Sequence, residues 1–205
     1  MKILFIDNFD SFTFNLVDEF KKRNCIIEVY RNNTPMKKIN EIVSEFRPDL
    51  IVLSPGPSNP ENAGNCIKII NEFKGIIPIF GVCLGLQCIV TALGGKVSKC
   101  SETIHGKPSK VIHDKKTIFF ELKNPIICGR YHSLSASEIP KELEISAKTE
   151  NEIIMGVRAK KSIFLEGVQF HPESIMTSQG GKIIENIIEL IGKKNEKLKN
   201  GEKND

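Results

Sequence analysis

The sequence predicts an α/β fold: a doubly wound, mostly parallel sheet with helices on both faces, extended by antiparallel strands in the second half of the chain. In the first half, short continuous apolar runs alternate with helical patterns, as in sheets covered on both faces. The second half has short apolar runs separated by turns. The 205 residues are 40% hydrophobic and 26% charged, which excludes disordered, collagen-like and low-complexity classes for most of the chain.

The first half should contain four buried strands and four helices. Phe12, Leu16 and Phe20 recur at helical spacing, and Asp10 or Ser11 is the expected N-cap of this first helix. Apolar residues mark three further helices in the same way. The expected strands are residues 3–6, 26–30, 50–53 and 76–80, and the expected helices lie around 12–20, 39–46, 67–73 and 86–93.

The second half should add antiparallel strands and one long helix. Isoleucines from Ile183 to Ile191 form a single apolar stripe, which predicts that helix. We therefore expect one domain over residues 1–194 and a disordered tail over 195–205, where no apolar stripe continues. The expected short strands are 111–112, 118–120, 126–128, 143–147, 153–157 and 163–168.

Charge patterning indicates which partners to expect. The net charge of +4 is scattered, and the densest basic run, 107–116, holds no aromatic residue, so we expect a solvated face there rather than a nucleic-acid partner. His113, in that run, is expected at the surface. The uncharged stretch 75–95 is broken by Pro78 and several glycines, which favours a strand, a turn and a buried helix over a membrane span.

The start of the chain lacks a secretion signal pattern, so we expect a cytoplasmic protein with reduced thiols. The six cysteines form no CxxC pair, which disfavours zinc and thioredoxin-like sites, and most should be buried thiols. We expect no metal and no cofactor.

The strongest chemical signal is Gly81-Val82-Cys83-Leu84-Gly85, a G-x-C-x-G version of the nucleophile elbow. An apolar strand precedes it and a helix follows. The flanking glycines make room for a tight turn, and the helix N-terminus favours a thiolate at Cys83. A buried structural cysteine in a glycine-rich turn is the alternative interpretation.

A cysteine nucleophile needs a base and an oxyanion site. His171 follows a predicted strand and is the best-placed base, and Glu173 can accept its imidazole N–H. One oxyanion donor should be the backbone N–H of Leu84, directly after the nucleophile. The second should come from the rigid loop 54–60, where Gly56 permits close approach of the backbone to a ligand.

These three blocks, in this order and spacing, resemble the class I (triad-type) glutamine amidotransferases, from residue 1 to about 194. The segments Ile6-Asp7-Asn8-Phe9-Asp10-Ser11-Phe12-Thr13 and Arg130-Tyr131-His132-Ser133-Leu134 resemble the glutaminase subunits of anthranilate synthase and aminodeoxychorismate synthase. The resemblance implies that Cys83 is the nucleophile, His171 the base and Glu173 the orienting acid. It implies a glutamine site formed by Gly56, Pro57, Ser58, Leu84, Gln87, Ser133 and Leu134.

Two details of the resemblance concern single segments. The family often has Gly or Cys at the position of Ser58. In the family the backbone, not the side chain, contacts glutamine at this position. The segment His105-Gly106-Lys107 matches a family segment near the partner chain.

The resemblance implies a glutaminase subunit that hydrolyses L-glutamine through a Cys thioester. It implies delivery of ammonia to a chorismate-binding partner subunit, giving anthranilate for tryptophan biosynthesis. Two alternatives stay open: the subunit serves aminodeoxychorismate synthase in folate biosynthesis, or it serves both enzymes. Minor alternatives are the glutaminase of GMP synthetase, a γ-glutamyl peptidase and a non-catalytic binding module. We expect a heteromeric complex and no membrane association.

Overall fold

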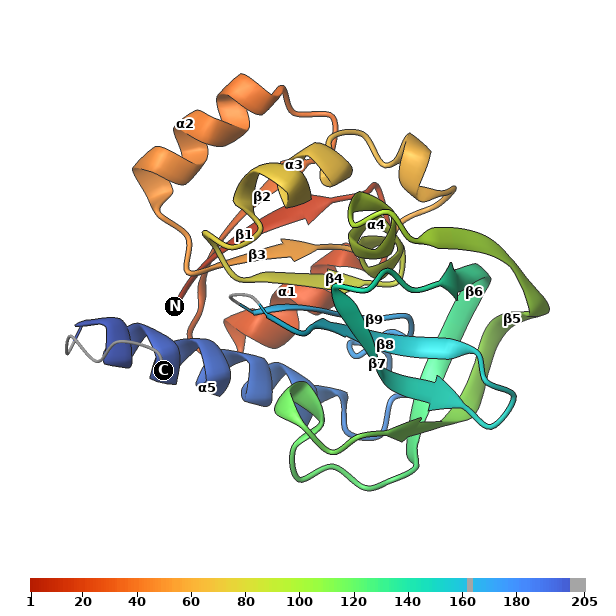
Figure 1. Ribbon diagram of the computed structural model, residues 1–205. Helices are drawn as coiled ribbons and strands as arrows, with labels where there is room; N and C mark the ends of the chain where they lie inside the picture. The colour runs from red at the N-terminus through yellow and green to blue at the C-terminus, as the bar shows by residue number, and fades with distance from the viewer. Residues whose placement is uncertain (162–163, 200–205) are drawn as a thin grey trace.

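The computed structural model describes residues 1–161 and 164–199, with side chains described except at 101–105 and 194–199. It consists of one nine-stranded sheet with helices on both faces (Figure 1). The strands are β1 (Lys2–Asp7), β2 (Ile26–Arg31), β3 (Leu50–Leu53), β4 (Ile79–Val82), β5 (Lys96–His113), β6 (Ile126–Glu138), β7 (Leu143–Thr149), β8 (Ile154–Ala159) and β9 (Leu165–Val168). The helices are α1 (Thr13–Lys21), α2 (Met36–Phe46), α3 (Cys66–Phe73), α4 (Leu84–Ala92) and α5 (Gly180–Lys199), with 3₁₀ turns η1 (Pro60–Asn62) and η2 (Thr117–Phe119).

The sheet has the order β2-β1-β3-β4-β9-β8-β7-β5-β6. Strands β2, β1, β3, β4 and β9 are parallel, and β8, β7, β5 and β6 continue the sheet in antiparallel pairs. The predicted fold class is therefore confirmed. Val82 at the end of β4 pairs with Val168 at the end of β9, so the loops after these two strands begin side by side. Parallel sheets place their sites at this carboxyl edge.

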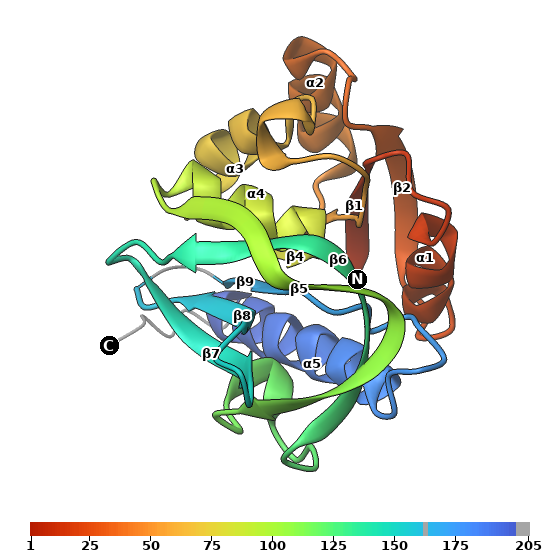
Figure 2. The same cartoon turned by 90° about the vertical axis from the view of Figure 1, so that its right-hand side faces the viewer.

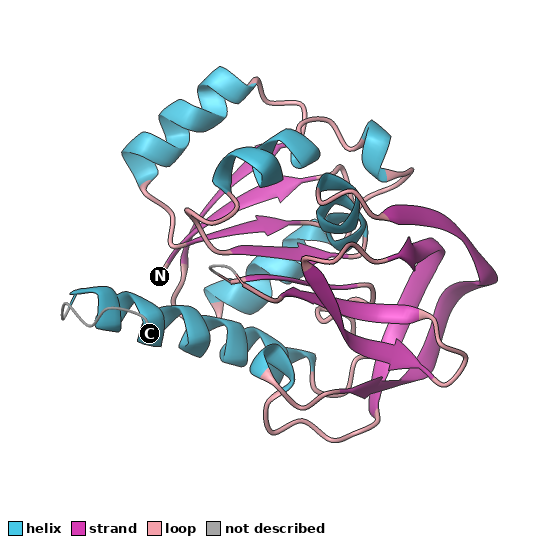
Figure 3. Ribbon diagram, viewed as in Figure 1, coloured by secondary structure: helices cyan, strands magenta, loops and turns pink. Residues whose placement is uncertain are grey.

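Alternating residues of the central strands supply two separate cores. Ile3 and Phe5 of β1 pack with residues of α1 and α5, whereas Leu4 and Ile6 pack with residues of α2, α3 and α4. Figure 3 shows these helix layers on opposite sides of the strands. Because both faces are covered, β1 needs apolar side chains on both faces from Ile3 to Ile6, which explains its continuous apolar run.

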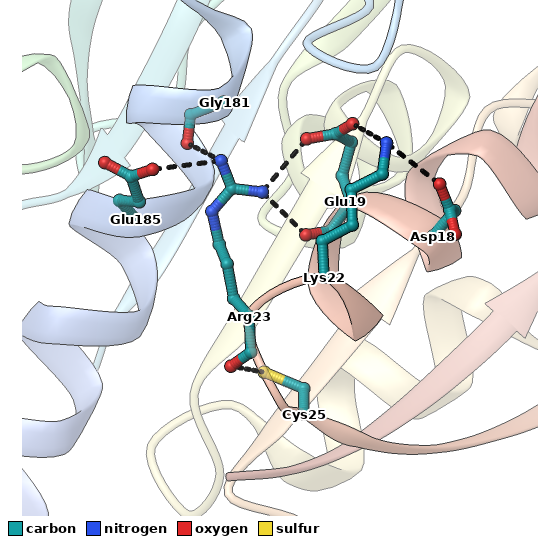
Figure 4. Close-up of polar contacts among 7 residues, drawn as sticks. All are labelled: Asp18, Glu19, Lys22, Arg23, Cys25, Gly181 and Glu185. Atoms are coloured by element: carbon teal, nitrogen blue, oxygen red, sulfur yellow. Dashed lines mark hydrogen bonds and ion pairs between the residues drawn. The ribbon is translucent and has the colours of Figure 1, made fainter.

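Arg23, just beyond α1, links α1 to α5 on their shared face (Figure 4). Its guanidinium donates to the Glu19 carbonyl at 2.7 Å and to the Gly181 carbonyl at 3.0 Å. It also pairs with the carboxylates of Glu19 and Glu185, both at 3.0 Å. One side chain thus fixes the start of α5 against the end of α1 although 158 residues separate Arg23 from Gly181.

Several local predictions were wrong, two of them at the ends of elements. The strand before the elbow begins at Ile79 rather than Ile76, because the N–H groups of Ile76 and Ile77 still bond to the Phe73 carbonyl and Pro78 has no N–H. Phe12, not Asp10 or Ser11, is the N-cap of α1, although Asp10 does accept a hydrogen bond from the Phe12 N–H.

The predicted strand 118–120 is also wrong, because this segment contains the 3₁₀ turn η2. Asn186 of α5 donates to the carbonyls of Ile118 and Phe120, which holds the turn against the helix. His113 is buried, not exposed. Its ring stacks on Phe119 with centroids 4.8 Å apart, and its Nε2 lies 2.9 Å from the Lys123 carbonyl.

Strands β5 and β6 are far longer than the short strands predicted there. They pair over most of their length with three register shifts, and the last residues of β5, Val111–His113, pair with β7 as well. Figure 2 shows β5 as a long curved strand that starts beside α4 and reaches the opposite end of the molecule. Residues 131–134, in the middle of β6, line the same cavity as residues 56–58 and 83 at the carboxyl edge of the parallel strands.

The C-terminal helix α5 continues to Lys199, so it includes residues 195–199 of the predicted tail; residues 200–205 lie outside the described residues. Among the described residues, no helix has the length and apolar character needed to cross a membrane. The uncharged stretch 75–95 instead contains β4, the elbow and α4, as predicted.

Candidate active site

Cys83 lies at the sharp turn between β4 and α4. Its φ of 54° lies in the left-handed region, which is strained for a residue with a side chain. The turn depends on its glycines: a Cβ on Gly81 would lie 2.5 Å from the carbonyl carbon of Gly85, and one on Gly85 would overlap the Leu53 carbonyl of β3. The Cys83 N–H donates to the Val168 carbonyl at 2.8 Å, which ties the elbow to β9. The elbow predicted from the sequence is confirmed as a structure.

His171 and Glu173 form a buried pair on the loop after β9. His171 Nδ1 lies 2.7 Å from Glu173 Oε1, and the Glu173 side chain is fully buried. The His171 N–H donates to the Gly129 carbonyl, and its own carbonyl accepts from Thr177 Oγ1. Among the described residues, His171 Nε2 has no well-formed hydrogen bond. This nitrogen is therefore the one available to Cys83 and to a reacting group.

The surroundings of His171 favour its protonated form. Burial alone would lower its pKa, but interactions with the Cys83 thiol and the Glu173 carboxylate outweigh it and raise the pKa to about 10. Phe12 and Tyr131 pack edge-on against the imidazole, with ring centroids 6.0 and 5.0 Å away. These rings restrict the imidazole to the orientation that the Glu173 bond sets.

The loop after β3 meets the elbow. A Cβ on Gly56 would lie 2.5 Å from Asn8 Cβ and 2.8 Å from Leu84 Cδ2, so only glycine allows this approach. Asn8 holds the loop: its backbone N–H donates to Ser54 Oγ at 2.9 Å and its Nδ2 to the Ser54 carbonyl at 2.7 Å. Ser58 has a φ of 72°, a backbone conformation that favours glycine. The two predicted oxyanion donors, Gly56 and Leu84, thus come from segments in direct contact.

A cavity of about 320 Å³ opens beside Cys83. Six of the seven residues predicted to bind glutamine line it, from the loop after β3, from α4 and from β6. Leu84 does not line it, but as the first residue of α4 it follows Cys83 directly. The lining residues are Asp10, Gly56, Pro57, Ser58, Cys83, Gln87, Tyr131, His132, Ser133 and Leu134.

The sequence did not predict a place in the site for Asp10, Tyr131 and His132, which also line the cavity. All three stand in the two motifs that carried the family resemblance, so the signal was there without a role attached. His132 is buried, and burial, together with the Arg130 charge, lowers its pKa to about 4, so the ring is neutral near pH 7. Gln169, fully buried two residues before His171, carried no recognisable pattern.

Three further predictions concern the cysteines, metal binding and residues 105–107. All six cysteines are free and buried, as expected for most of them. Among the side chains that the structure describes, no three of His, Cys, Asp or Glu are grouped so as to hold a metal ion. The side chain of His105 lies outside the described residues, so the role of His105-Gly106-Lys107 stays a prediction.

Comparison with known proteins decides the family. The model of the glutamine amidotransferase class-I family matches residues 4–190. The chain belongs to the class-I glutamine amidotransferases. The resemblance predicted from the elbow, from His171 and Glu173, and from the loop 54–60 is therefore confirmed.

Relatives of this class-I amidotransferase cover nearly its whole length. It is 48% identical over 197 residues to "Anthranilate synthase component 2" of Methanocaldococcus jannaschii, covering 92% of this chain and 96% of the relative. It is 46% identical over 193 residues to "Aminodeoxychorismate/anthranilate synthase component 2" of Bacillus subtilis, covering 93% and 97%. A solved structure of a GMP synthase subunit homologue from Thermoplasma acidophilum has a TM-score of 0.85 at 24% identity, covering 97% and 98% of the two chains. That likeness establishes the fold alone.

The site of this amidotransferase holds the residue types that acyl transfer requires. It combines a cysteine at a helix N-terminus with a histidine that has a buried carboxylate partner, and the loop of the predicted oxyanion donor Gly56 contacts Leu84. The intact set argues against the non-catalytic binding module.

Proposed function

We propose that this chain is the glutaminase subunit of anthranilate synthase, with Cys83, His171 and Glu173 as its catalytic residues. The observation that carries the proposal is the buried His171–Glu173 pair beside the Cys83 elbow, at a cavity large enough for one amino acid. Glutamine is held there by Gly56, Pro57, Ser58, Leu84, Gln87, Ser133 and Leu134.

In the first step, the Cys83 thiolate attacks the side-chain carboxamide carbon of glutamine. The carbonyl oxygen becomes an oxyanion, and the N–H groups of Gly56 and Leu84 bind it. The His171 imidazolium gives its proton to the amide nitrogen, the C–N bond breaks, and ammonia leaves. Glu173 holds the imidazole in the orientation that this transfer needs. A γ-glutamyl thioester remains on Cys83.

In the second step, water attacks the thioester. His171, now neutral, takes a proton from the water, and the C–S bond breaks as glutamate forms. The sulfur leaves as a thiolate, and His171 again carries the proton. A His171 pKa of about 10 agrees with a protonated imidazole in this state.

The ammonia has to reach its acceptor directly, because in neutral water it becomes ammonium, which is no nucleophile. We infer a partner subunit that binds chorismate and adds ammonia to it, in a cytoplasmic heteromeric complex. The names of the relatives from M. jannaschii and B. subtilis support this partner. The B. subtilis name also supports a second candidate, a subunit shared with aminodeoxychorismate synthase.

Reconstitution tests the proposal. The chain is mixed with each candidate chorismate-using partner, chorismate, Mg²⁺ and glutamine, and the aromatic product is identified by chromatography. Anthranilate alone supports the first candidate, and both anthranilate and aminodeoxychorismate support a shared subunit. Neither product, from partners that are active with ammonia, would refute the proposed acceptor.

A further inference from the structure

A chain of hydrogen bonds leads from β6 to the Cys83 sulfur, and its direction is fixed at its far end. Arg130 is buried, and its Nε donates to His132 Nε2 at 3.0 Å. A guanidinium can only donate, so His132 Nε2 accepts. The neutral imidazole then carries its hydrogen on Nδ1, which lies 2.9 Å from the Leu134 carbonyl and donates to it.

Gln87 continues this chain from the Leu134 carbonyl. That carbonyl can only accept, so the amide nitrogen of Gln87, 3.2 Å away, faces it. The same nitrogen donates to Gln169 Oε1, also at 3.2 Å. Both hydrogens of the Gln87 amide are therefore used within the protein. The Gln87 side-chain oxygen is the end left to face the cavity. There it can accept a hydrogen bond from the α-ammonium group of the substrate glutamine.

Gln169 is the last member of the chain. Because its oxygen faces Gln87, its amide nitrogen faces Cys83 Sγ, at 3.5 Å. The side chain is fully buried, and the backbone N–H of Gln169 donates to the Met155 carbonyl of β8 at 2.9 Å. The side-chain amide of Gln169 thus contacts Gln87 through its oxygen and Cys83 through its nitrogen, and it cannot flip without breaking the bond to Gln87.

We propose that Gln169 is a further catalytic residue, which donates an N–H hydrogen bond to the Cys83 thiolate while fixing the Gln87 amide with its acceptor oxygen toward the substrate. The inference rests on the proposed role of Cys83 as the nucleophile. A bond from N–H to an anionic sulfur is charge-assisted, so it favours the thiolate over the thiol. It also holds the sulfur on the side of the elbow that faces the cavity.

Two substitutions separate the two contacts of Gln169. Gln169→Glu keeps an oxygen toward Gln87 but replaces the donor at the sulfur by a second carboxylate oxygen. Gln169→Met is of similar length and removes both contacts. Gln179→Glu is the matched control: the Gln179 oxygen accepts from the Lys123 N–H, the side chain does not line the cavity, and the glutamate keeps that bond.

The first readout is the rate at which iodoacetamide alkylates Cys83 in the full-length chain from pH 6 to pH 10, with mass spectrometry to assign the modified cysteine. We expect Gln169→Glu to slow alkylation at pH 7 by about 10- to 100-fold and to move its pH midpoint upward. The deficit should shrink at the alkaline end, where Cys83 is a thiolate in every variant. The ionisable groups around Cys83 are otherwise unchanged in all variants: His171, Glu173, Asp10, Tyr131 and His132.

The second readout is glutamine-dependent synthesis by the complex with the chorismate-using partner. Gln169→Glu should lower kcat with little change in the KM for glutamine, whereas Gln169→Met should lower kcat and raise KM as well. A purely structural role would lower the melting temperature without this split. Ammonia-dependent synthesis checks that each variant still folds and binds the partner.

The outcomes distinguish the inference from the function on which it rests. The role of Gln169 is refuted if Gln169→Glu is alkylated and turns over glutamine at the rates of wild type and of Gln179→Glu. The proposed function still stands in that case if Cys83→Ser is inactive with glutamine. If Cys83→Ser keeps glutamine-dependent synthesis, the proposed function itself fails.

Discussion

Replacing Gly56 by alanine should remove nearly all glutamine-dependent activity while the protein stays folded. The new Cβ would lie 2.5 Å from Asn8 Cβ and 2.8 Å from both the Asn8 carbonyl oxygen and Leu84 Cδ2. Carbon atoms in contact are about 3.5–4.0 Å apart, so the loop has to move by about 1 Å. Asn8 cannot give way easily, because it is bonded twice to Ser54 and accepts from Asn32 Nδ2 at 2.9 Å.

The size of the effect follows from this displacement. Overpacking a buried contact costs about 1–3 kcal/mol, less than the roughly 5–15 kcal/mol by which a domain is stable, so the variant should fold. The Gly56 N–H is one of two proposed oxyanion donors. Loss of one such donor lowers kcat by about 10²–10³-fold, and a shift of about 1 Å is enough to lose it.

The assay compares glutamine-dependent with ammonia-dependent synthesis by the reconstituted complex. Only the glutamine-dependent rate should fall. Gly192→Ala is the control, because a Cβ there meets nothing within 4 Å and alanine suits the interior of α5. A Gly56→Ala variant with the kcat of wild type and an unchanged melting temperature would refute the assignment of this loop to the oxyanion site.

Three further predictions concern the catalytic pair, the nucleophile and the helix layer. Cys83→Ala should abolish glutamine-dependent synthesis and leave ammonia-dependent synthesis intact; residual glutamine use would exclude Cys83 as the nucleophile. Glu173→Gln should lower the pKa of His171, which Glu173 helps to raise to about 10. The imidazolium is then lost at lower pH, so the alkaline limb of the kcat/KM profile should move to lower pH, and an unmoved limb would contradict this role. Arg23→Met should lower the free energy of unfolding by about 1–2 kcal/mol in denaturant titrations, with glutaminase activity unchanged, because it breaks bonds to Glu19 and α5; an unchanged midpoint would show that these bonds add nothing.

The elbow could be predicted from the sequence because its chemistry is local. Gly81 and Gly85 are needed within a few residues of Cys83, and the strand and helix on either side have strong apolar patterns. The central parallel sheet was predictable for the same reason, since burial on both faces requires a continuous apolar run in each strand. The membership of His171 in the same site followed from its place after a strand.

Features that depend on distant contacts could not be predicted. The burial of His113 arises from stacking on Phe119 and a bond to Lys123, whereas three lysines lie within three residues of it in the sequence. The length of β5 could not be predicted because three register shifts interrupt its pairing with β6, and such shifts leave no regular pattern in the sequence. Gln169 looked like one polar residue at a strand end. Only the fold shows that its amide lies between Gln87 and Cys83.

The position of β9 has a consequence for how the enzyme is made. It is the last strand of the sheet in chain order, yet it lies in the middle, between β4 and β8. Until it is synthesised and inserted, β4 and β8 each expose an unpaired edge, which is the kind of surface that chaperones protect and that promotes aggregation. The same insertion brings in His171. A nascent or truncated chain that ends before β9 therefore carries the cysteine without its base, so glutamine hydrolysis cannot begin before the sheet is closed.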